Sequence, residues 1–431
     1  MQESPKGAEL ERTTFSVSKG YARYVLLILT GVYAFNFLDR QILVILQEPI
    51  KAELGLSDMQ LGLLTGTVFA LFYVILGIPI ARLADRYNRK NIISIALTLW
   101  SGMTALSGLA QNYLQLVLAR IGVGVGEAGG SPPAHAIISD YFPPKKRATA
   151  LSIYSMGVYI GIFLGFLVGG IIGQQYGWRI ALFALGIPGI LYAVMVYLTV
   201  KEPPRGWTDK VKDINETSFS DAIKLLYSKK TFVLVALATG MQTITNYGVG
   251  NFMPSFMSRL HGLDLQKAGI ILAFCAGLGG GLGTFLGGYI ADKLRHRDIR
   301  WYLWIGILGA TINFLPATIA YFSSNTSLVI GALLISNICI ALYLGPSIAV
   351  AHSLVSAKMR ALASAVLFFA LNLIGLGCGP LLIGQLSDML EPTFGIESIR
   401  YAFILTYFTS IITILLFFLA SKNYKKDLSE I

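Results

Sequence analysis

The sequence predicts an all-α membrane protein in which twelve transmembrane helices form two pseudo-symmetric halves of six. Of its 431 residues, 55% are hydrophobic and 13% are charged, and the mean hydropathy is +0.65. A soluble domain averages about 25% charged residues. Apolar runs of about 20 residues, the length that crosses a bilayer, recur along the whole chain. We expect spans at 22–47, 58–83, 91–109, 113–141, 148–173, 178–200, 231–257, 266–292, 302–322, 327–350, 361–386 and 399–420.

An internal repeat at a spacing of 207 residues divides the chain into its two halves. The pairs at this spacing are Gly55 and Gly262, Gly62 and Gly269, and Asp85 and Asp292. Ser57 and Asp264, one in each copy, suit the N-cap of a helix. We therefore expect an N-terminal six-helix half at 1–200, a cytoplasmic linker at 201–230 with an amphipathic stretch near 219–226, and a C-terminal half at 231–431. Such repeats rock against each other around a central site.

The basic residues predict the orientation of the helices. Of the 34 Lys and Arg residues, 27 fall on the side that holds both termini and the linker, five on the other side and two inside helices. An excess of Lys and Arg marks the cytoplasmic side. We expect a multi-pass protein with both termini in the cytoplasm, in the inner membrane if the source is bacterial. The net charge of +11 then reflects topology and indicates no nucleic-acid partner.

No pattern in the sequence indicates an enzyme, a metal site or a cofactor. The four histidines are scattered, and neither HExxH nor GxSxG occurs. The three cysteines lie apart within apolar spans and form no CxxC pair. Because no Walker A motif occurs, we expect no ATP-driven transport.

Glycines recur every fourth residue on the fifth predicted span. They are Gly157, Gly161, Gly165 and Gly169. This spacing puts them on one helix face and lets another backbone approach closely. The contact is either a sliding one between the halves or ordinary tight packing of two helices. Gly375, Gly377 and Gly379 are the expected counterpart on the eleventh span.

Four charged residues lie inside predicted spans of the first half. Asp39 and Arg40 lie about 15 Å below the outer surface and Arg120 about 12 Å below it, whereas Glu127 lies about 10 Å deeper. We expect Asp39 and Arg120 to pair and Glu127 to lie near the midplane. Intramembrane charges are costly and usually functional. The two acids either couple transport to protons or form a static salt bridge.

A short basic segment with an aspartate follows the second span and recurs in the second half. The first copy runs Gly77-Ile-Pro-Ile-Ala-Arg-Leu-Ala-Asp85-Arg86-Tyr-Asn-Arg89-Lys90, and the second covers 287–297. It resembles the loop signature of the major facilitator superfamily. The resemblance implies that fold and secondary transport by alternating access. It also implies gating latches in which the aspartate meets a helix N-terminus; the alternative is that the motif only sets topology. The gating residues are Asp85, Arg86, Arg89, Arg147, Asp292 and Arg360.

Two intramembrane motifs resemble the Spinster branch of that superfamily. They are Asn36-Phe-Leu-Asp39-Arg40, and Arg120-Ile-Gly-Val-Gly-Val-Gly-Glu127-Ala followed by Pro132-Pro133. Members of this branch carry sphingolipids and lysophospholipids, and some are proton-driven. The resemblance implies that Asp39 and Glu127 couple protons and that Arg40 and Arg120 are the basic positions of the motif.

The second half offers only neutral polar and aromatic groups within its spans, opposite the charged first half. One charged and one apolar wall suit an amphiphile with a polar head and a hydrocarbon tail. A small organic anion or drug-like compound is the alternative. The expected substrate-binding residues are Asn36, Arg40, Arg120, Asn246, Tyr247 and Phe369. The expected partners are protons, a small amphiphilic substrate and membrane lipids, and we expect a monomer.

Overall fold

A computed structural model describes residues 16–208, 219–356 and 359–429, and nearly all of these are helical. The first half contains α2 (Lys19–Ile45), α3 (Gln47–Leu54), α4 (Asp58–Gly62), α5 (Val68–Arg86), α6 (Arg89–Ser107), α7 (Tyr113–Glu127), α8 (Ser131–Tyr141), α9 (Pro144–Tyr176) and α10 (Trp178–Thr199). The short helix α11 (Phe219–Ser228) follows in the linker, where an amphipathic stretch is predicted. The rest of the linker at 209–218 lies outside the described residues.

The second half repeats this arrangement. It contains α12 (Lys230–His261), α13 (Leu265–Leu272), α14 (Gly279–Leu294), α15 (Trp301–Phe322), α16 (Thr326–Ala341), α17 (Leu344–Ser353), α18 (Arg360–Ala370), α19 (Gly377–Phe394), α20 (Ser398–Leu405) and α21 (Tyr407–Ser429). Each of the twelve predicted spans coincides with one of these helices or with two joined in line, so the predicted spans are confirmed.

Nine stretches of the described residues are long and apolar enough to cross a membrane. One of them runs through α18 to α21 and therefore contains two of the predicted spans. The two remaining predicted spans, which correspond to α6 and to α7 with α8, are not among the nine.

Local sequence signals set where the repeated helices begin and bend. Ser57 caps α4 in a reciprocal capping box with Gln60, and Asp264 caps α13, so both predicted N-caps are confirmed. In each half the helix that follows the cap contains a π-helical turn, at Leu63–Thr67 and Ala273–Leu278. A third π-helical turn, Leu371–Leu376, joins α18 to α19. Such turns are frequent at functional sites in helices.

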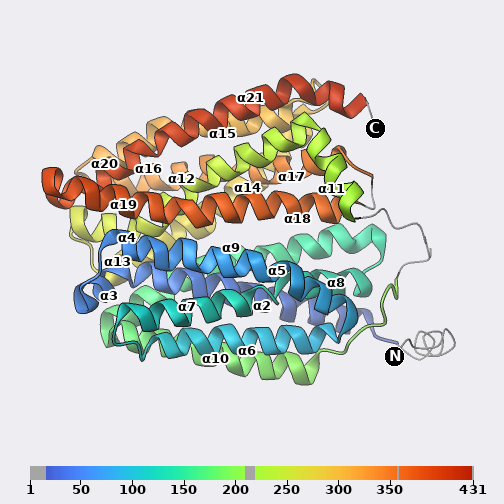
Figure 1. Ribbon diagram of the computed structural model, residues 1–431, viewed down its shortest axis with the longest axis horizontal. Helices are drawn as coiled ribbons and strands as arrows, with labels where there is room; N and C mark the ends of the chain where they lie inside the picture. The colour runs from blue at the N-terminus through green and yellow to red at the C-terminus, as the bar shows by residue number, and fades with distance from the viewer. Residues whose placement is uncertain (1–15, 209–218, 357–358, 430–431) are drawn as a thin grey trace.

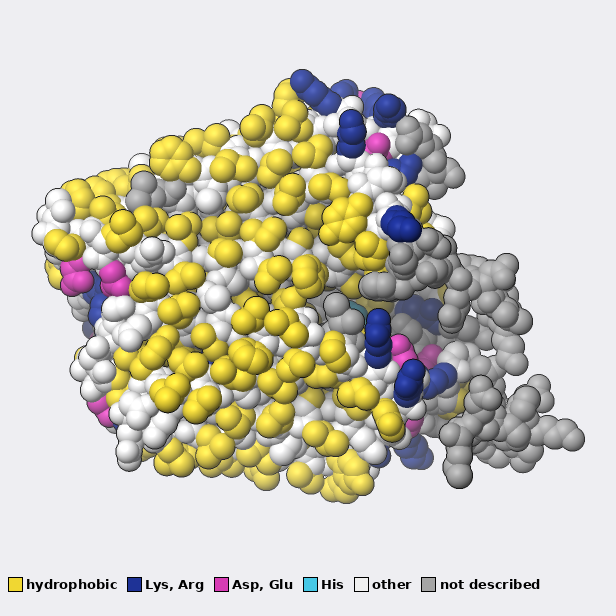
Figure 2. Space-filling view, in the orientation of Figure 1, with side chains coloured by type: hydrophobic (Ala, Val, Ile, Leu, Met, Phe, Trp, Pro, Cys, Tyr) yellow, Lys and Arg dark blue, Asp and Glu magenta, His cyan; other side chains and the backbone are white. Residues whose placement is uncertain are grey.

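The two halves lie side by side with their long helices roughly aligned (Figure 1). Both chain termini lie at one end, with α8 and α11, and we call this the terminal end. The opposite end, with α3, α4 and α13, is the far end. Figure 2 shows hydrophobic side chains over the flank of the bundle and Lys and Arg side chains gathered toward the terminal end. A hydrophobic flank of this kind fits the lipid interior of a bilayer.

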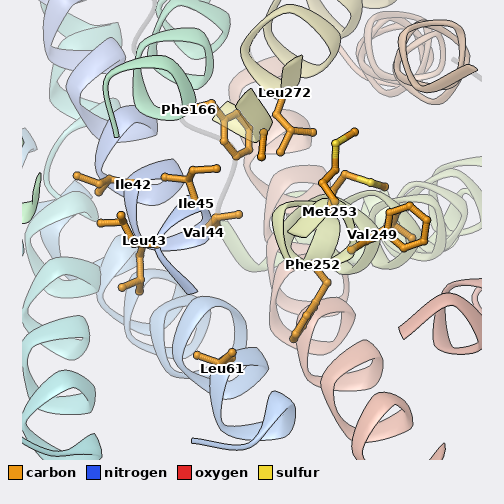
Figure 3. Packing of buried hydrophobic residues seen from close by; sticks show 14 of the residues in the cluster. Ile42, Leu43, Val44, Ile45, Leu61, Phe166, Val249, Phe252, Met253 and Leu272 are labelled. Atoms are coloured by element: carbon orange, nitrogen blue, oxygen red, sulfur yellow. The ribbon is translucent and has the colours of Figure 1, made fainter. Parts of the chain in front are cut away.

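The hydrophobic core shared by the two halves is largest toward the far end. There, side chains of the two halves form one buried cluster, part of which Figure 3 shows. Its labelled members are Ile42, Leu43, Val44, Ile45, Leu61 and Phe166 of the first half and Val249, Phe252, Met253 and Leu272 of the second. Toward the terminal end the core divides into a cluster around Trp100, which is formed by the first half with Leu376 of the second, and a cluster around Phe417 in the second half. The halves are therefore joined mainly at the far end.

The glycines of α9 pack against α2 within the first half. A Cβ on Gly157 would lie 2.6 Å from the carbonyl oxygen of Thr30, and one on Gly161 would lie 2.3 Å from that of Ala34. Gly379 approaches α12 of the second half in the same way. Of the two interpretations of this face, tight helix packing is therefore the one observed. The contacts of α9 with the other half are made by different residues, which include Gly170 against Gly269 of α13 and Tyr159 against Thr284 of α14.

Candidate functional site

Two helices of the first half supply four buried charged side chains. Asp39 and Arg40 lie on α2 and Arg120 and Glu127 on α7, with exposed fractions of 1%, 6%, 4% and 0%. All four are charged groups within apolar segments, and Glu127 lies at the end of α7, just before α8. Their burial carries a cost of several kcal/mol unless partners compensate it, which marks this cluster as the candidate site.

Glu127 pairs with Arg40, not with Arg120. The Nε atom of Arg40 donates to Oε2 of Glu127 at 2.7 Å. The predicted pairing of Asp39 with Arg120 is therefore wrong. The prediction used backbone depth alone, whereas helical side chains lean toward the N-terminus of their own helix. Because α2 and α7 run in opposite directions, Arg40 leans toward the level of Glu127 and Arg120 leans away from it.

Asp39 and Arg120 have few partners. Oδ2 of Asp39 accepts a hydrogen bond from Ser101 at 3.5 Å, and its other oxygen has no partner among the described residues. Within that part of the chain, no carboxylate lies within 4.0 Å of Arg120, and its Nε is unpartnered. Both side chains line a cavity of about 10 Å³, close to the volume that one water molecule needs.

Aromatic rings from α2 and α5 surround the arginines. The guanidinium carbon of Arg40 lies 4.7 Å from the ring centre of Phe69, and that of Arg120 lies 4.5 Å from the same ring. Phe37 and Tyr73 flank Arg40 at 4.8 and 5.0 Å. Cation–π contacts offset part of the cost of burying a guanidinium. The sequence analysis missed these rings, although the four-residue spacing of Phe69 and Tyr73 places them on one face of α5.

The predicted substrate-binding residues meet the charged cluster only in part. Asn36 lies beside Glu127, and Tyr247 of the second half lies beside Arg40. Tyr247 also packs against the core of the first half. In the described chain no hydrogen bond or ion pair joins Asn246 or Phe369 to the cluster, and Phe369 is 43% exposed. The substrate-binding roles remain predictions.

Two of the predicted gating residues are anchored at the terminal end. Arg89 is buried, forms ion pairs with Asp140 and Glu202, and donates to the carbonyl oxygen of Pro203. It thereby fixes the start of α6 to α8 and to the linker. Arg147 of α9 donates to the carbonyl oxygen of Ser139 at 2.8 Å.

The other predicted gating residues lie at the surface of the terminal end. Asp85 and Arg86 are exposed, and neither has a side-chain hydrogen bond within the described chain. Arg360 is likewise exposed. Asp292 accepts a hydrogen bond from the hydroxyl of Tyr302 at 2.5 Å, within its own half. Neither aspartate meets Arg147 or Arg360 here, and the gating roles remain predictions.

A charged network that the sequence analysis did not anticipate joins the halves at the far end. Arg259 of α12 binds Glu48 at 2.7 Å and Asp58 at 2.6 Å, both of the first half. Lys51 also contacts Asp58, at 2.5 Å. In addition, Asp388 of α19 accepts hydrogen bonds from the backbone N–H groups of Asp58 and Met59 at 2.9 and 2.8 Å. This network and the shared core hold the far end closed.

Comparisons with known proteins agree with this architecture. The sequence profile of the Major Facilitator Superfamily matches residues 29–376. The chain is 33% identical to an MFS-type efflux pump of Mycolicibacterium smegmatis, over 94% of this chain and 93% of the pump. It is 26% identical to protein spinster homolog 3 of Danio rerio, over 99% of this chain and 90% of that protein.

Among solved structures, one similar protein is a bacterial homolog of the human lysosomal transporter Spinster in an inward-facing, unoccupied conformation. The TM-score is 0.90 and the identity 33%, over 95% of this chain and 99% of that one. These matches confirm the fold and the Spinster resemblance that the motifs of α2 and α7 indicated. The chain belongs to the Major Facilitator Superfamily of membrane transporters.

Proposed function

We propose that this transporter couples protons to the movement of a lipid-like amphiphile of the lysophospholipid or sphingolipid type. The observation that carries the proposal is the buried ion pair of Arg40 and Glu127, next to Asp39 and Arg120, for which the described residues provide no ion-pair partner. Two acids and two arginines at one place allow protonation of an acid to free an arginine for an anionic head group.

The coupling rests on competition for Arg40. While Glu127 is ionised, it occupies the guanidinium of Arg40. Protonation of Glu127 removes that charge, so that Arg40 can take a phosphate or carboxylate head instead. Arginine suits this role because its planar fork binds such groups in a bidentate manner. Protonation of Asp39 would break no ion pair, so Asp39 can take up a proton without releasing an arginine.

The hydrocarbon tail would lie against the second half. Tyr247 reaches the cluster from α12, and the facing helices of that half present neutral and aromatic side chains. We also propose that the terminal end faces the cytoplasm, because 27 of the 34 Lys and Arg residues belong to that side. With the far end closed, the described conformation would then be inward-facing.

Flux into proteoliposomes under an imposed pH gradient tests the coupling. We expect that Glu127→Gln and Asp39→Asn each abolish the response of lysophospholipid flux to the gradient. Glu391→Gln, an exposed glutamate at the end of α19, is the matched control and should behave as wild type. An unchanged response in both cluster variants would overturn proton coupling.

A small organic anion or drug-like compound is the second candidate. The similarity to a mycobacterial efflux pump favours it. A tail-less analogue such as glycerol phosphate separates the two. If the amphiphile is the substrate, the analogue should bind more weakly than the lysolipid, and Arg120→Lys should weaken lysolipid binding because the fork is lost. Equal binding of both compounds would favour the small anion.

A further inference from the structure

A second, larger cavity lies apart from the charged cluster, where α2 and α9 separate at the terminal end. Its volume is about 520 Å³, and its lining includes Arg23 and Leu27 of α2 and Lys146 and Thr149 of α9. Further along the same two helices, Gly157 and Thr30 are in close contact. The cavity therefore lies between the ends of α2 and α9, before the point along the two helices where they pack closely. We call it the α2–α9 crevice.

The crevice combines apolar walls with two cations at its rim. Leu26, Leu27 and Ile153 supply hydrocarbon walls, and Leu27 is 64% exposed. Arg23 and Lys146 are exposed, and no acidic side chain of the described chain pairs with either of them. Each helix contributes one cation. Lys146 also lies in the first turn of α9, where the helix dipole favours an anion.

We propose that the α2–α9 crevice binds one anionic membrane phospholipid, with its phosphate between Arg23 and Lys146 and its acyl chain against the apolar walls. Lys and Arg gather at this end of the bundle, as they do at the headgroup level of the cytoplasmic leaflet. A soluble phosphate would use the cations and leave the apolar walls exposed. None of the four residues of the charged cluster lines the crevice, so this lipid is distinct from the transported substrate.

The lipid would fill the space between α2 and α9, two helices of the same half. Since α2 and α9 are in close contact from Gly157 onward, an acyl chain in the crevice would cover the side chains left without a partner helix. The inference does not depend on proton coupling or on the identity of the substrate.

Native mass spectrometry of the delipidated, full-length protein tests the proposal. Phosphatidylglycerol, phosphatidylcholine and glycerol phosphate are titrated separately. We expect wild type to bind phosphatidylglycerol most tightly. The double variant Arg23→Gln/Lys146→Gln should bind it more weakly by about fivefold for each cation removed. Thr149→Trp, which fills the crevice without a change of charge, should also lose one bound lipid.

The matched control removes two charges from the same helices outside the crevice. Lys19→Gln/Lys145→Gln changes exposed residues of α2 and α9 that do not line the cavity. It should retain wild-type lipid binding. Equal weakening in the two double variants would show general attraction to a basic surface and would overturn the site. Glycerol phosphate binding as tight as that of phosphatidylglycerol would overturn the lipid as occupant, as would wild-type binding in Thr149→Trp.

Discussion

The far end and the terminal end of the bundle contain the same kinds of parts, but only at the far end are those parts in contact across the halves. At the far end, Arg259 binds acids of the opposite half, and Asp388 accepts from the N-terminus of α4. At the terminal end, Asp85 is exposed without a partner in the described chain, and the buried residues form two clusters that share few residues across the halves. In the described conformation the contacts between the halves at the far end are therefore formed, and those expected at the terminal end are not.

The interaction expected of the latch at the terminal end, a carboxylate at a helix N-terminus, is observed at the far end. The sequence analysis assigned Asp85 to a helix N-terminus, where the dipole stabilises a carboxylate. In the structure, Asp388 has that environment, and it comes from the other half of the protein. A transporter that alternates between two states needs comparable closure energies at its two ends.

The largest effect should follow from Arg259→Gln. The change leaves Glu48 and Asp58 without their shared cation, and removal of one partner of a buried ion pair costs about 3–5 kcal/mol. The population closed at the far end should fall by about a hundredfold or more. Distances between spin labels at Leu109 and Ser324, which lie in far-end loops, should lengthen. Arg179→Gln, which breaks an ion pair with Glu53 inside the first half, should leave these distances unchanged.

A bulky residue at Gly77 or Gly288 should block the closure of the terminal end. Gly77 lies on the same face of α4 and α5 as Gly62 and Gly66, which contact α19 and the π-helical turn before it. Gly288 lies one turn after Thr284 on α14, on the face where Thr284 hydrogen-bonds Tyr159 of α9. A Cβ at either glycine meets nothing within 4 Å here, whereas one on Gly62 would lie 2.3 Å from the carbonyl oxygen of Pro380. The described conformation therefore tolerates Gly77→Leu and Gly288→Leu.

In the alternate state the same changes would overpack the contact, at a cost of about 1–3 kcal/mol. Flux should fall while thermal stability in detergent is retained. Spin labels at Tyr87 and His296, exposed positions of the terminal end, should lose their short-distance population. Wild-type flux in both leucine variants would contradict the assignment of these faces. Gly250→Leu, also without a neighbour within 4 Å, is the control for added bulk alone.

The fold could be predicted because each helix has a local signal in the sequence. Apolar runs gave the spans, Ser57 and Asp264 gave two helix starts, and the 207-residue spacing gave the pairing of the halves. Asp39, Arg40, Arg120 and Glu127 could also be identified as the charges inside the spans, since an ionised side chain in an apolar span stands out, but Glu127 was expected about 10 Å away from the other three.

The partners within that cluster could not be predicted from depth alone. Arg40 reaches Glu127 because a long side chain spans the offset between backbone levels, and the direction of that reach depends on the helix direction. The far-end network was missed for a different reason. Arg259 and Asp58 lie at helix ends, where charged residues are ordinary, and only the packing of two halves in one conformation brings them together.

A smaller effect is expected from Asp388→Ala at the far end. The change removes a carboxylate that accepts from two backbone N–H groups at the start of α4, and loss of such a cap costs about 0.5–2 kcal/mol. The distances between Leu109 and Ser324 should shift in the same direction as in Arg259→Gln, but less. Asp388→Asn keeps an acceptor and should lie between Asp388→Ala and wild type. A shift in Asp388→Ala as large as that of Arg259→Gln would place the main closure energy in the cap.

The smallest effect should come from Asp85→Asn, because Asp85 is exposed and has no side-chain partner to lose among the residues that the structure describes. If Asp85 meets a helix N-terminus only when the terminal end closes, its charge stabilises that state alone, by about 0.3–1 kcal/mol. The short-distance population between Tyr87 and His296 should then fall by about two- to fivefold, with no change at the far end. Asp298→Asn is the matched control, since Asp298 pairs with Arg300 and Lys425 inside the second half at the same end. Equal shifts in the two variants would show that the effect comes from general surface charge and would contradict a latch at Asp85. The absence of a shift in both variants would show that Asp85 does not stabilise closure of the terminal end, which would then depend on the helix contacts at Gly77 and Gly288.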